Sequence, residues 1–219
     1  MTNYTKKKRT NKNKTLKKKS SKYLIIEKYK HKDYLLKTDT VYYKLYSNTN
    51  VKCQGLKQKS DKNNTITANT LKMRDKIFGH PVNNDKYLEY KKKILIDKNV
   101  TKKIIKLINK NFLHTFCLHK DFLLIGQSQK IKKINPVADL LSKHTTLCME
   151  YLRDTDNGKI HICTAGEMAI INDILYFSND SGSYRPRLTT LYKIREAFPM
   201  LHIKIVDAGY FKKIGIKYE

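Results

Sequence analysis

Several features that define specialised chains are missing from this sequence of 219 residues. It has no Trp, 8 Gly and 4 Pro, a composition that excludes collagen-like and Pro/Gly-rich low-complexity proteins. No run of about 18 apolar residues occurs, which argues against a membrane-spanning helix. The first residues, MTNYTKKKRTNKNKTLKKKSSKY, have no apolar stretch behind their charges, so a secretory signal is not predicted. We therefore expect an intracellular protein that is not secreted.

Cysteines are few and far apart. The four are Cys53, Cys117, Cys148 and Cys163, with no CxxC pair, so reduced thiols are expected. A short segment with His114, Cys117 and His119 has the residue types of a metal site. In a strand, however, side chains alternate, and His114 would point away from the other two. No metal site is therefore predicted, and the sequence identifies no cofactor.

Positive charge dominates the chain and is unevenly distributed. The 46 Lys and Arg against 19 Asp and Glu give a net charge of +27. The first 120 residues hold 32 basic and 8 acidic side chains, or +24, and the remaining residues hold 14 and 11, or +3. Charge at this density attracts phosphate polymers through counterion release. An AT-rich genome, whose codons favour Lys, Asn, Ile and Tyr, is the alternative explanation.

Residues 1–22 carry the densest charge and almost nothing apolar. Such a segment cannot bury enough surface to offset its ordering entropy, so a disordered basic tail is predicted. Its two basic clusters indicate a nucleic-acid-binding arm or a nuclear-import signal, and a solvated tail that aids solubility is the alternative. The candidate nucleic-acid-binding residues are Lys6, Lys7, Lys8, Arg9, Lys17, Lys18 and Lys19.

Residues 23–112 predict a basic region of mixed α and β structure. YLIIEKY (23–29) and TVYYKLY (40–46) are rich in aromatic and β-branched residues, which is typical of strands. Residues 47–65 are polar and predict a long loop. Apolar residues at helical spacing predict helices over ANTLKMRDKIFGH (68–80) and VTKKIIKLINKNF (100–112), the second capped by Asn99 or Thr101.

Residues 113–219 predict a second, α+β region. FLHTFCLHKDFLLIGQ (112–127) predicts two strands around a turn, and NPVADLLSKH (135–144) predicts a short helix. A strand over 168–179 is expected to bend at Asn172-Asp173, followed by a helix over 186–198 and an alternating strand over 200–211. The fold class predicted for the whole chain is therefore α+β, an antiparallel sheet with a few short helices.

Asn157-Gly158 stands between two β-rich runs and predicts a tight hairpin, because both residues accept positive φ. A two-residue loop there would place six side chains on one face, and His144 would join them if its strand runs straight. A Glu beside a His can carry out acid-base chemistry. The ordinary alternative is a solvated outer face. The six are Cys148, Glu150, Leu152, Cys163, Ala165 and Glu167.

The stretch SNDSGSYRPRLTT (178–190) predicts a turn, with positive φ at Gly182, and a helix that begins at Pro186. Unpaired N–H groups at a helix start, beside two arginines, favour phosphate or carboxylate. A plain helix cap is the alternative. The anion-binding candidates are Ser181, Gly182, Ser183, Arg185 and Arg187. The catalytic candidates are His144, Glu167 and Tyr184.

The segment TAGEMAIINDILYFSNDSGSYRP (164–186), preceded by HTTL, resembles a pattern in uncharacterised proteins of giant DNA viruses of the mimivirus type and in some bacterial toxin-like domains. The pattern contains Ala-Gly-Glu and then Asn-x-Ser-Gly-His-Tyr-x-Pro. Ser183 replaces its histidine, Thr145 and Thr146 replace two serines, and Asp173-Ile174 replace Gly-Lys. The matching residues are His144, Ala165, Gly166, Glu167, Leu175, Asn179, Ser181, Gly182, Tyr184 and Pro186.

Three functions follow as expectations. The basic arm predicts electrostatic affinity for nucleic acid. The His144, Glu167 and Tyr184 set predicts a transferase or hydrolase of a nucleotide-like substrate. The resemblance implies a viral protein of the host cytoplasm, nucleus or virion, and an inert structural component of a virion is the third alternative.

Overall fold

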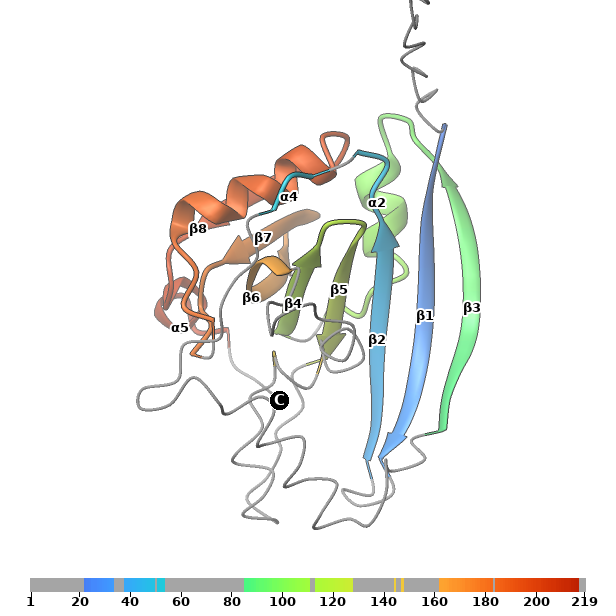
Figure 1. Ribbon diagram of the computed structural model, residues 1–219, viewed down its shortest axis with the longest axis horizontal. Coiled ribbons are helices and arrows are strands. Elements are labelled where there is room, and N and C mark those ends of the chain that lie inside the picture. The colour runs from blue at the N-terminus through green and yellow to red at the C-terminus, as the bar shows by residue number, and fades with distance from the viewer. Residues whose placement is uncertain are drawn as a thin grey trace, which may run out of the picture.

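In the described part of the chain, eight strands form one sheet at the centre of the molecule, with strand order β3-β1-β2-β5-β4-β6-β7-β8. The computed structural model describes residues 22–33, 38–49, 51–53, 85–110, 113–127, 144, 147, 162–182 and 184–216. Figure 1 shows β1, β2 and β3 on the right and β6, β7 and β8 on the left, with short helices against the sheet. The predicted α+β class is confirmed.

Neighbouring strands of the sheet are antiparallel, except that β7 and β8 are parallel. The parallel pair needs a crossover, which is provided by the 3-10 helix η3 (Leu188–Leu191) and the helix α4 (Tyr192–Ala197). The strands are β1 (Tyr23–Asp33), β2 (Thr38–Tyr46), β3 (Asp85–Leu95), β4 (His114–His119), β5 (Phe122–Gln127), β6 (Ile162–Ile171), β7 (Ile174–Ser178) and β8 (Ile203–Val206).

Local sequence signals predicted most of the described strands. The strands over 23–29 and 40–46 are confirmed and are longer than predicted, and 112–127 forms two strands as expected. The bend at Asn172-Asp173 is confirmed as the β6–β7 turn, where φ is 50° and 59°. Asn and Asp tolerate this left-handed backbone better than most residues, which explains the tight hairpin.

Sequence reasoning missed β3, the strand DKYLEYKKKIL. It pairs with β1, and among the described residues it has no partner on its other side. Lysines are common on such edge strands because they discourage pairing with another chain. Because lysines occupy positions where apolar residues would reveal a strand, the sequence of β3 shows no clear alternation. A bulge opposite Lys28/Tyr29 interrupts the alternation as well.

Other predictions lie outside the described residues. They include the tail up to residue 21, the loop from 54 to 65, the helix over 68–80 and the hairpin at Asn157-Gly158. Of the helix predicted over 135–144, only His144 is described, and its backbone is helical.

The helices differ from their predictions. α2 covers Val100–Ile105, half the predicted length. Asn99 occupies the N-cap position, as predicted, but its side chain makes no capping hydrogen bond. The Asp97 carboxylate accepts the Asn99 N–H at 2.9 Å, and the Thr101 hydroxyl accepts the His202 N–H at 2.9 Å. The strand predicted over 200–211 is also wrong in its second half. A left-handed Gly209 (φ 79°) ends the extended backbone, and α5 (Tyr210–Lys213) follows.

The main core lies on the face of the sheet that α2 and α4 cover. Ile104, Ile105 and Ile194 of these helices belong to one buried cluster with the sheet residues Leu24, Ile26, Leu45, Phe116 and Phe177. On the opposite face, Phe211 of α5 packs with Leu113 and Ala169, and Tyr184 packs with Cys117 and Ala165. Strands from both predicted regions, 23–112 and 113–219, therefore share one sheet and one core.

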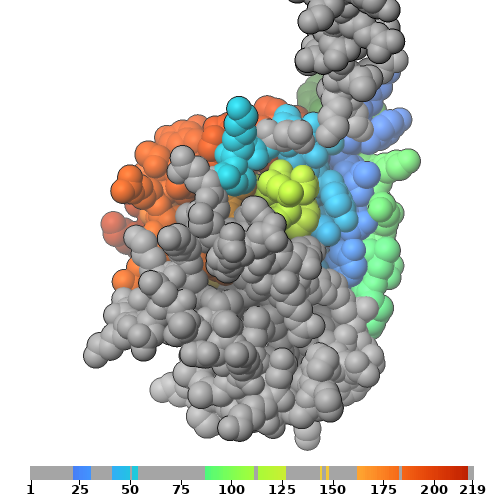
Figure 2. Space-filling model, in the orientation of Figure 1, coloured from blue at the N-terminus to red at the C-terminus, as the bar shows by residue number. Residues whose placement is uncertain are grey.

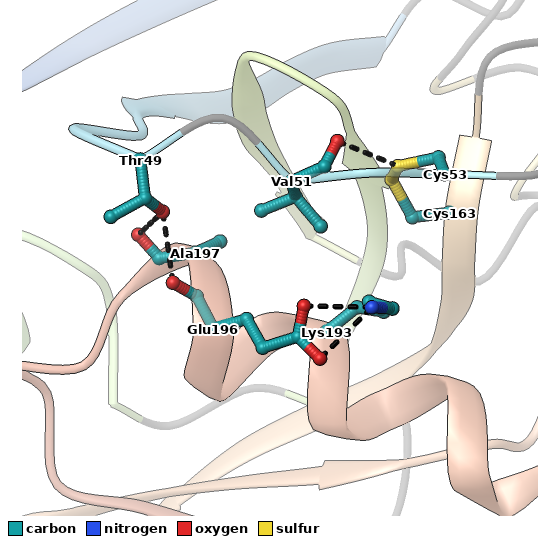
Figure 3. Close-up of polar contacts among 7 residues, drawn as sticks. All are labelled: Thr49, Val51, Cys53, Cys163, Lys193, Glu196 and Ala197. Atoms are coloured by element: carbon teal, nitrogen blue, oxygen red, sulfur yellow. Dashed lines mark hydrogen bonds and ion pairs between the residues drawn. A yellow bond between two sulfur atoms is a disulfide. The ribbon is translucent and has the colours of Figure 1, made fainter.

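The described residues after β2, 47–49 and 51–53, lie over the end of α4 (Figure 3). The Thr49 hydroxyl donates to Glu196 O at 2.8 Å, and the Ser47 hydroxyl lies 3.0 Å from Ala197 O. These contacts satisfy carbonyls that a helix end leaves without internal partners. The segment ends at a Cys53–Cys163 disulfide, so the expectation of reduced thiols is wrong for this pair. Cys117 is a buried thiol.

Gly166 is required by the close approach of two strands. A Cβ atom there would overlap the Ser178 carbonyl oxygen of β7 and would lie 3.1 Å from Phe116 Cε1. The neighbour that comes this close is the backbone of β7.

We expect Gly166→Ala to lower the free energy of unfolding by about 3 kcal/mol, because the backbone of β7 must shift to relieve the overlap. Urea denaturation of the full chain measures this. Gly182→Ala is the matched control, since a Cβ at Gly182 meets nothing within 4 Å. Equal stability of the two variants would contradict the packing argument.

Candidate functional site

The three predicted catalytic residues lie near one another, on the face of the sheet opposite α2. His144 is 6% exposed, and its Nε2 donates to Gly166 O at 3.0 Å. Tyr184 is 1% exposed and meets the His144 ring edge-on, with centroids 6.4 Å apart. Glu167 follows Gly166 on β6 and is half-buried. His144 reaches this place from helical backbone and not, as predicted, from a straight strand.

The shared face predicted for the hairpin is only partly present. A bulge opposite Leu118/His119 leaves Cys163 as an extra residue on β6. Cys163 therefore packs in the main core, whereas Ala165 packs with Tyr184 on the other face. Strict alternation fails at a bulge. Cys148, Glu150 and Leu152 lie outside the described residues.

The predicted anion-binding loop uses its polar groups internally. Ser181 Oγ accepts the Tyr184 N–H at 3.3 Å, and Ser181 O accepts the Arg185 N–H at 2.8 Å. The Arg185 Nε donates to Gly182 O at 3.2 Å. The left-handed residue is Arg185 (φ 39°) and not Gly182. These bonds make the loop a closed turn.

Other predicted residues of this loop have separate positions. Arg185 and Arg187 are exposed, and the Asn179 side chain donates to Pro186 O at 3.1 Å. The helix begins at Leu188 and not at Pro186. Ser183 lies outside the described residues, as do the seven basic residues predicted in the N-terminal arm.

A second group of polar residues, which sequence reasoning did not identify, lies on β1, β2 and β3. Its centre is Glu27, which is 4% exposed. The Tyr29 and Tyr46 hydroxyls donate to Glu27 Oε2 at 2.7 and 2.8 Å, and Lys91 Nζ lies 2.8 Å from Oε1. The strand register brings them together, because Glu27 faces Lys44 of β2 and Lys91 of β3.

Electrostatics keep the Glu27 carboxylate ionised. Burial alone raises the pKa of Glu27, but hydrogen bonds from Lys91, Tyr29 and Tyr46 outweigh it, and the pKa is lowered. Burial, together with the neighbouring Glu27 charge, raises the pKa of Tyr46 to about 12. Tyr46 therefore stays protonated and keeps donating its hydrogen bond.

Lysine side chains cover the aromatic rings around this carboxylate. Lys44 Nζ lies 5.0 Å from the Tyr46 centroid and 4.2 Å from that of Phe122, which is paired with Tyr46. Lys91 Nζ lies 5.8 Å from the Tyr46 centroid. These are cation–π distances. Tyr29 and Tyr42 stack beside them, with centroids 5.0 Å apart.

We call Tyr29, Tyr42, Lys44, Tyr46 and Lys91 the lysine-tyrosine face. The available sequence signal was the alternation Tyr42-x-Lys44-x-Tyr46, which puts these three side chains on one side of a strand. Figure 2 shows atoms of β1, β2 and β3, coloured blue, cyan and green, side by side along the right of the molecule.

Among the described residues, no group of three or more His, Cys, Asp and Glu side chains could hold a metal ion. His114 is buried and its Nε2 donates to Asn109 O at 2.8 Å, and His119 stacks on Phe122. Within the same part of the chain, no helix has the length and apolar character needed to cross a membrane.

No protein-family model, curated protein or solved structure matches this chain. The resemblance to giant-virus proteins therefore stays a prediction.

We expect Glu27→Gln to lower the free energy of unfolding by about 1–3 kcal/mol at pH 7. The amide removes the ion pair with Lys91, and its NH2 group and the Lys91 ammonium are both donors that cannot bond to each other. The pKa of Glu27 is lowered by folding. Its contribution is therefore complete above the unfolded pKa of about 4.3 and is lost as the pH falls through the folded value.

Urea denaturation from pH 7 down to pH 3 measures the difference between the two proteins, which should shrink in acid. Glu196→Gln is the control, since Glu196 pairs with Lys193 at 2.7 Å on an exposed helix surface, where an ion pair contributes little. A difference that is the same at every pH would contradict the ionised, buried carboxylate.

Proposed function

We propose that this protein binds nucleic acid through the lysine-tyrosine face, with the basic N-terminal arm adding electrostatic affinity. The observation that carries the proposal is the combination of Lys44 and Lys91, on β2 and β3, with the rings of Tyr46 and Phe122. Sheet surfaces of this composition suit nucleic acid, because lysines contact phosphates and aromatic rings stack with bases.

The charge of the same strands supports the proposal. Lys91, Lys92 and Lys93 follow one another on β3 and are exposed. The one acidic side chain at the centre of the face, Glu27, is buried and paired with Lys91, so it offers phosphate little repulsion. The first 120 residues hold a net +24 of the total +27.

Two double variants test the face. Lys44→Gln/Lys93→Gln removes one charge from the face and one beside it, because Lys93 lies two residues from Lys91 on the same side of β3. We expect weaker binding and a salt slope of log K that falls by up to about 1.4, for two single-strand phosphate contacts. Fluorescence anisotropy with labelled oligo(dT) and a duplex, at several salt concentrations, measures both.

Lys204→Gln/Lys212→Gln is the matched control, because it removes the same charge from β8 and α5. Lys204 also lies over a tyrosine ring, Tyr176, at 5.3 Å. Equal losses in both double variants would mean that only net charge matters and would refute a defined face.

Deletion of residues 1–22 tests the arm separately. We expect lower affinity for every nucleic acid and a flatter salt dependence, since this segment would supply phosphate contacts without base contacts. The same anisotropy titrations measure it. Unchanged binding would show that the arm does not contribute to affinity. It would not bear on the lysine-tyrosine face, which the two double variants test.

The other functions expected from the sequence stay predictions. A transferase or hydrolase would use His144, Glu167 and Tyr184, and an inert virion component would use none of them. Neither has an observation as specific as the lysine-tyrosine face.

A further inference from the structure

A pocket of about 310 Å³ lies between the sheet and the segment that follows α2. It is on the face of β1 and β2 opposite the lysine-tyrosine face, because Lys28 and Tyr43 alternate with Glu27 and Lys44 along their strands. Val41, Leu107 and Ile108 supply apolar lining, and Lys28, Tyr43, Lys106 and Asn109 supply polar groups. Among the residues that the structure describes, no acidic side chain lines it.

The wall of this pocket is held in place by hydrogen bonds. The Tyr90 hydroxyl donates to Leu107 O at 3.4 Å, and His114 Nε2 donates to Asn109 O at 2.8 Å. The Leu107 N–H donates to Ile104 O at 2.9 Å, which ties the wall to α2. When a site is already formed in the free protein, ligand binding does not incur the entropy cost of ordering its side chains and backbone.

Tyr43 is the most buried polar group of the pocket, at 3% exposed. Burial raises the pKa of its hydroxyl, although Lys28 and the Asn109 N–H act in the opposite direction. The phenol is therefore neutral at pH 7 and keeps a proton to donate.

Charge around the pocket is positive after its ion pairs are counted. Glu89 lies 2.9 Å from Lys28 and 3.6 Å from Lys30, so one carboxylate is shared by two ammonium groups. Lys106 adds a further positive charge and is exposed. The excess of two charges matches a phosphate monoester, which carries nearly two negative charges at neutral pH.

We propose that this pocket binds a nucleoside monophosphate. The ribose and base would lie against Val41, Leu107 and Ile108, and the phosphate would meet Lys106 and Lys28, with Tyr43 donating a hydrogen bond. The volume is at the small end of ligand pockets, which suits a mononucleotide better than a larger cofactor. This site is separate from the lysine-tyrosine face and does not depend on the proposed function.

Titration of the full chain with adenosine 5′-monophosphate tests the proposal, with binding followed by calorimetry and by ¹H–¹⁵N chemical shifts. We expect saturable binding with shifts at Leu107, Ile108 and Asn109. Adenosine and inorganic phosphate should each bind at least about tenfold more weakly, since each keeps only part of the contacts. Binding of phosphate as tight as that of the nucleotide would overturn the assignment.

Variants on the same segment provide the control. Lys106→Gln should raise Kd at least about tenfold, because it removes a charge-assisted hydrogen bond, whereas Lys102→Gln, also exposed but outside the pocket lining, should leave Kd unchanged. Lys44→Gln/Lys93→Gln should also leave it unchanged. Equal losses for Lys106 and Lys102, or no saturable binding at millimolar nucleotide, would refute the proposal.

Discussion

The antiparallel ladder between β2 and β5 is the interaction on which the rest of the structure depends. Residues Tyr42 to Tyr46 pair with Gly126 to Phe122, and the Ser47 N–H extends the ladder by donating to Asp121 O at 2.9 Å. This pairing joins the three basic strands to the five that follow, in one sheet. It also sets Tyr46 beside Phe122, so that the Lys44 ammonium lies over both rings. On the other face it gives α2 and α4 a continuous surface for packing.

Local chemistry explains how much of the fold could be predicted. Asn172-Asp173 indicated a turn because both residues accept positive φ, and aromatic and β-branched runs indicated β1, β2, β4 and β5. β3 was missed because its lysines reflect an edge position, and edge position is a property of the whole sheet. α2 is shorter than predicted, and tertiary contacts hold the segment that follows it: the Tyr90 hydroxyl donates to Leu107 O and His114 Nε2 donates to Asn109 O. Apolar periodicity along one segment does not report such contacts.

The candidate sites also contain some features that local sequence could predict and others that only the whole fold determines. The sequence placed His144, Glu167 and Tyr184 near one another, but it could not show that Ser181 binds the N–H groups of its own loop. Glu27 had no signal at all: a single acidic residue in a strand becomes a buried centre only when the register sets Lys44 and Lys91 opposite it. Contacts between distant strands cannot be inferred from spacing along one strand.

The Cys53–Cys163 bond has a consequence for how the chain responds to a protease. The bond closes a loop with a sequence separation of 110 residues, and residues 54–84 lie within it. A single backbone cut anywhere between the two cysteines leaves both fragments covalently attached. The nicked chain then stays one covalent species until a reductant separates it into two, so a reducing gel shows the cleavage as two bands.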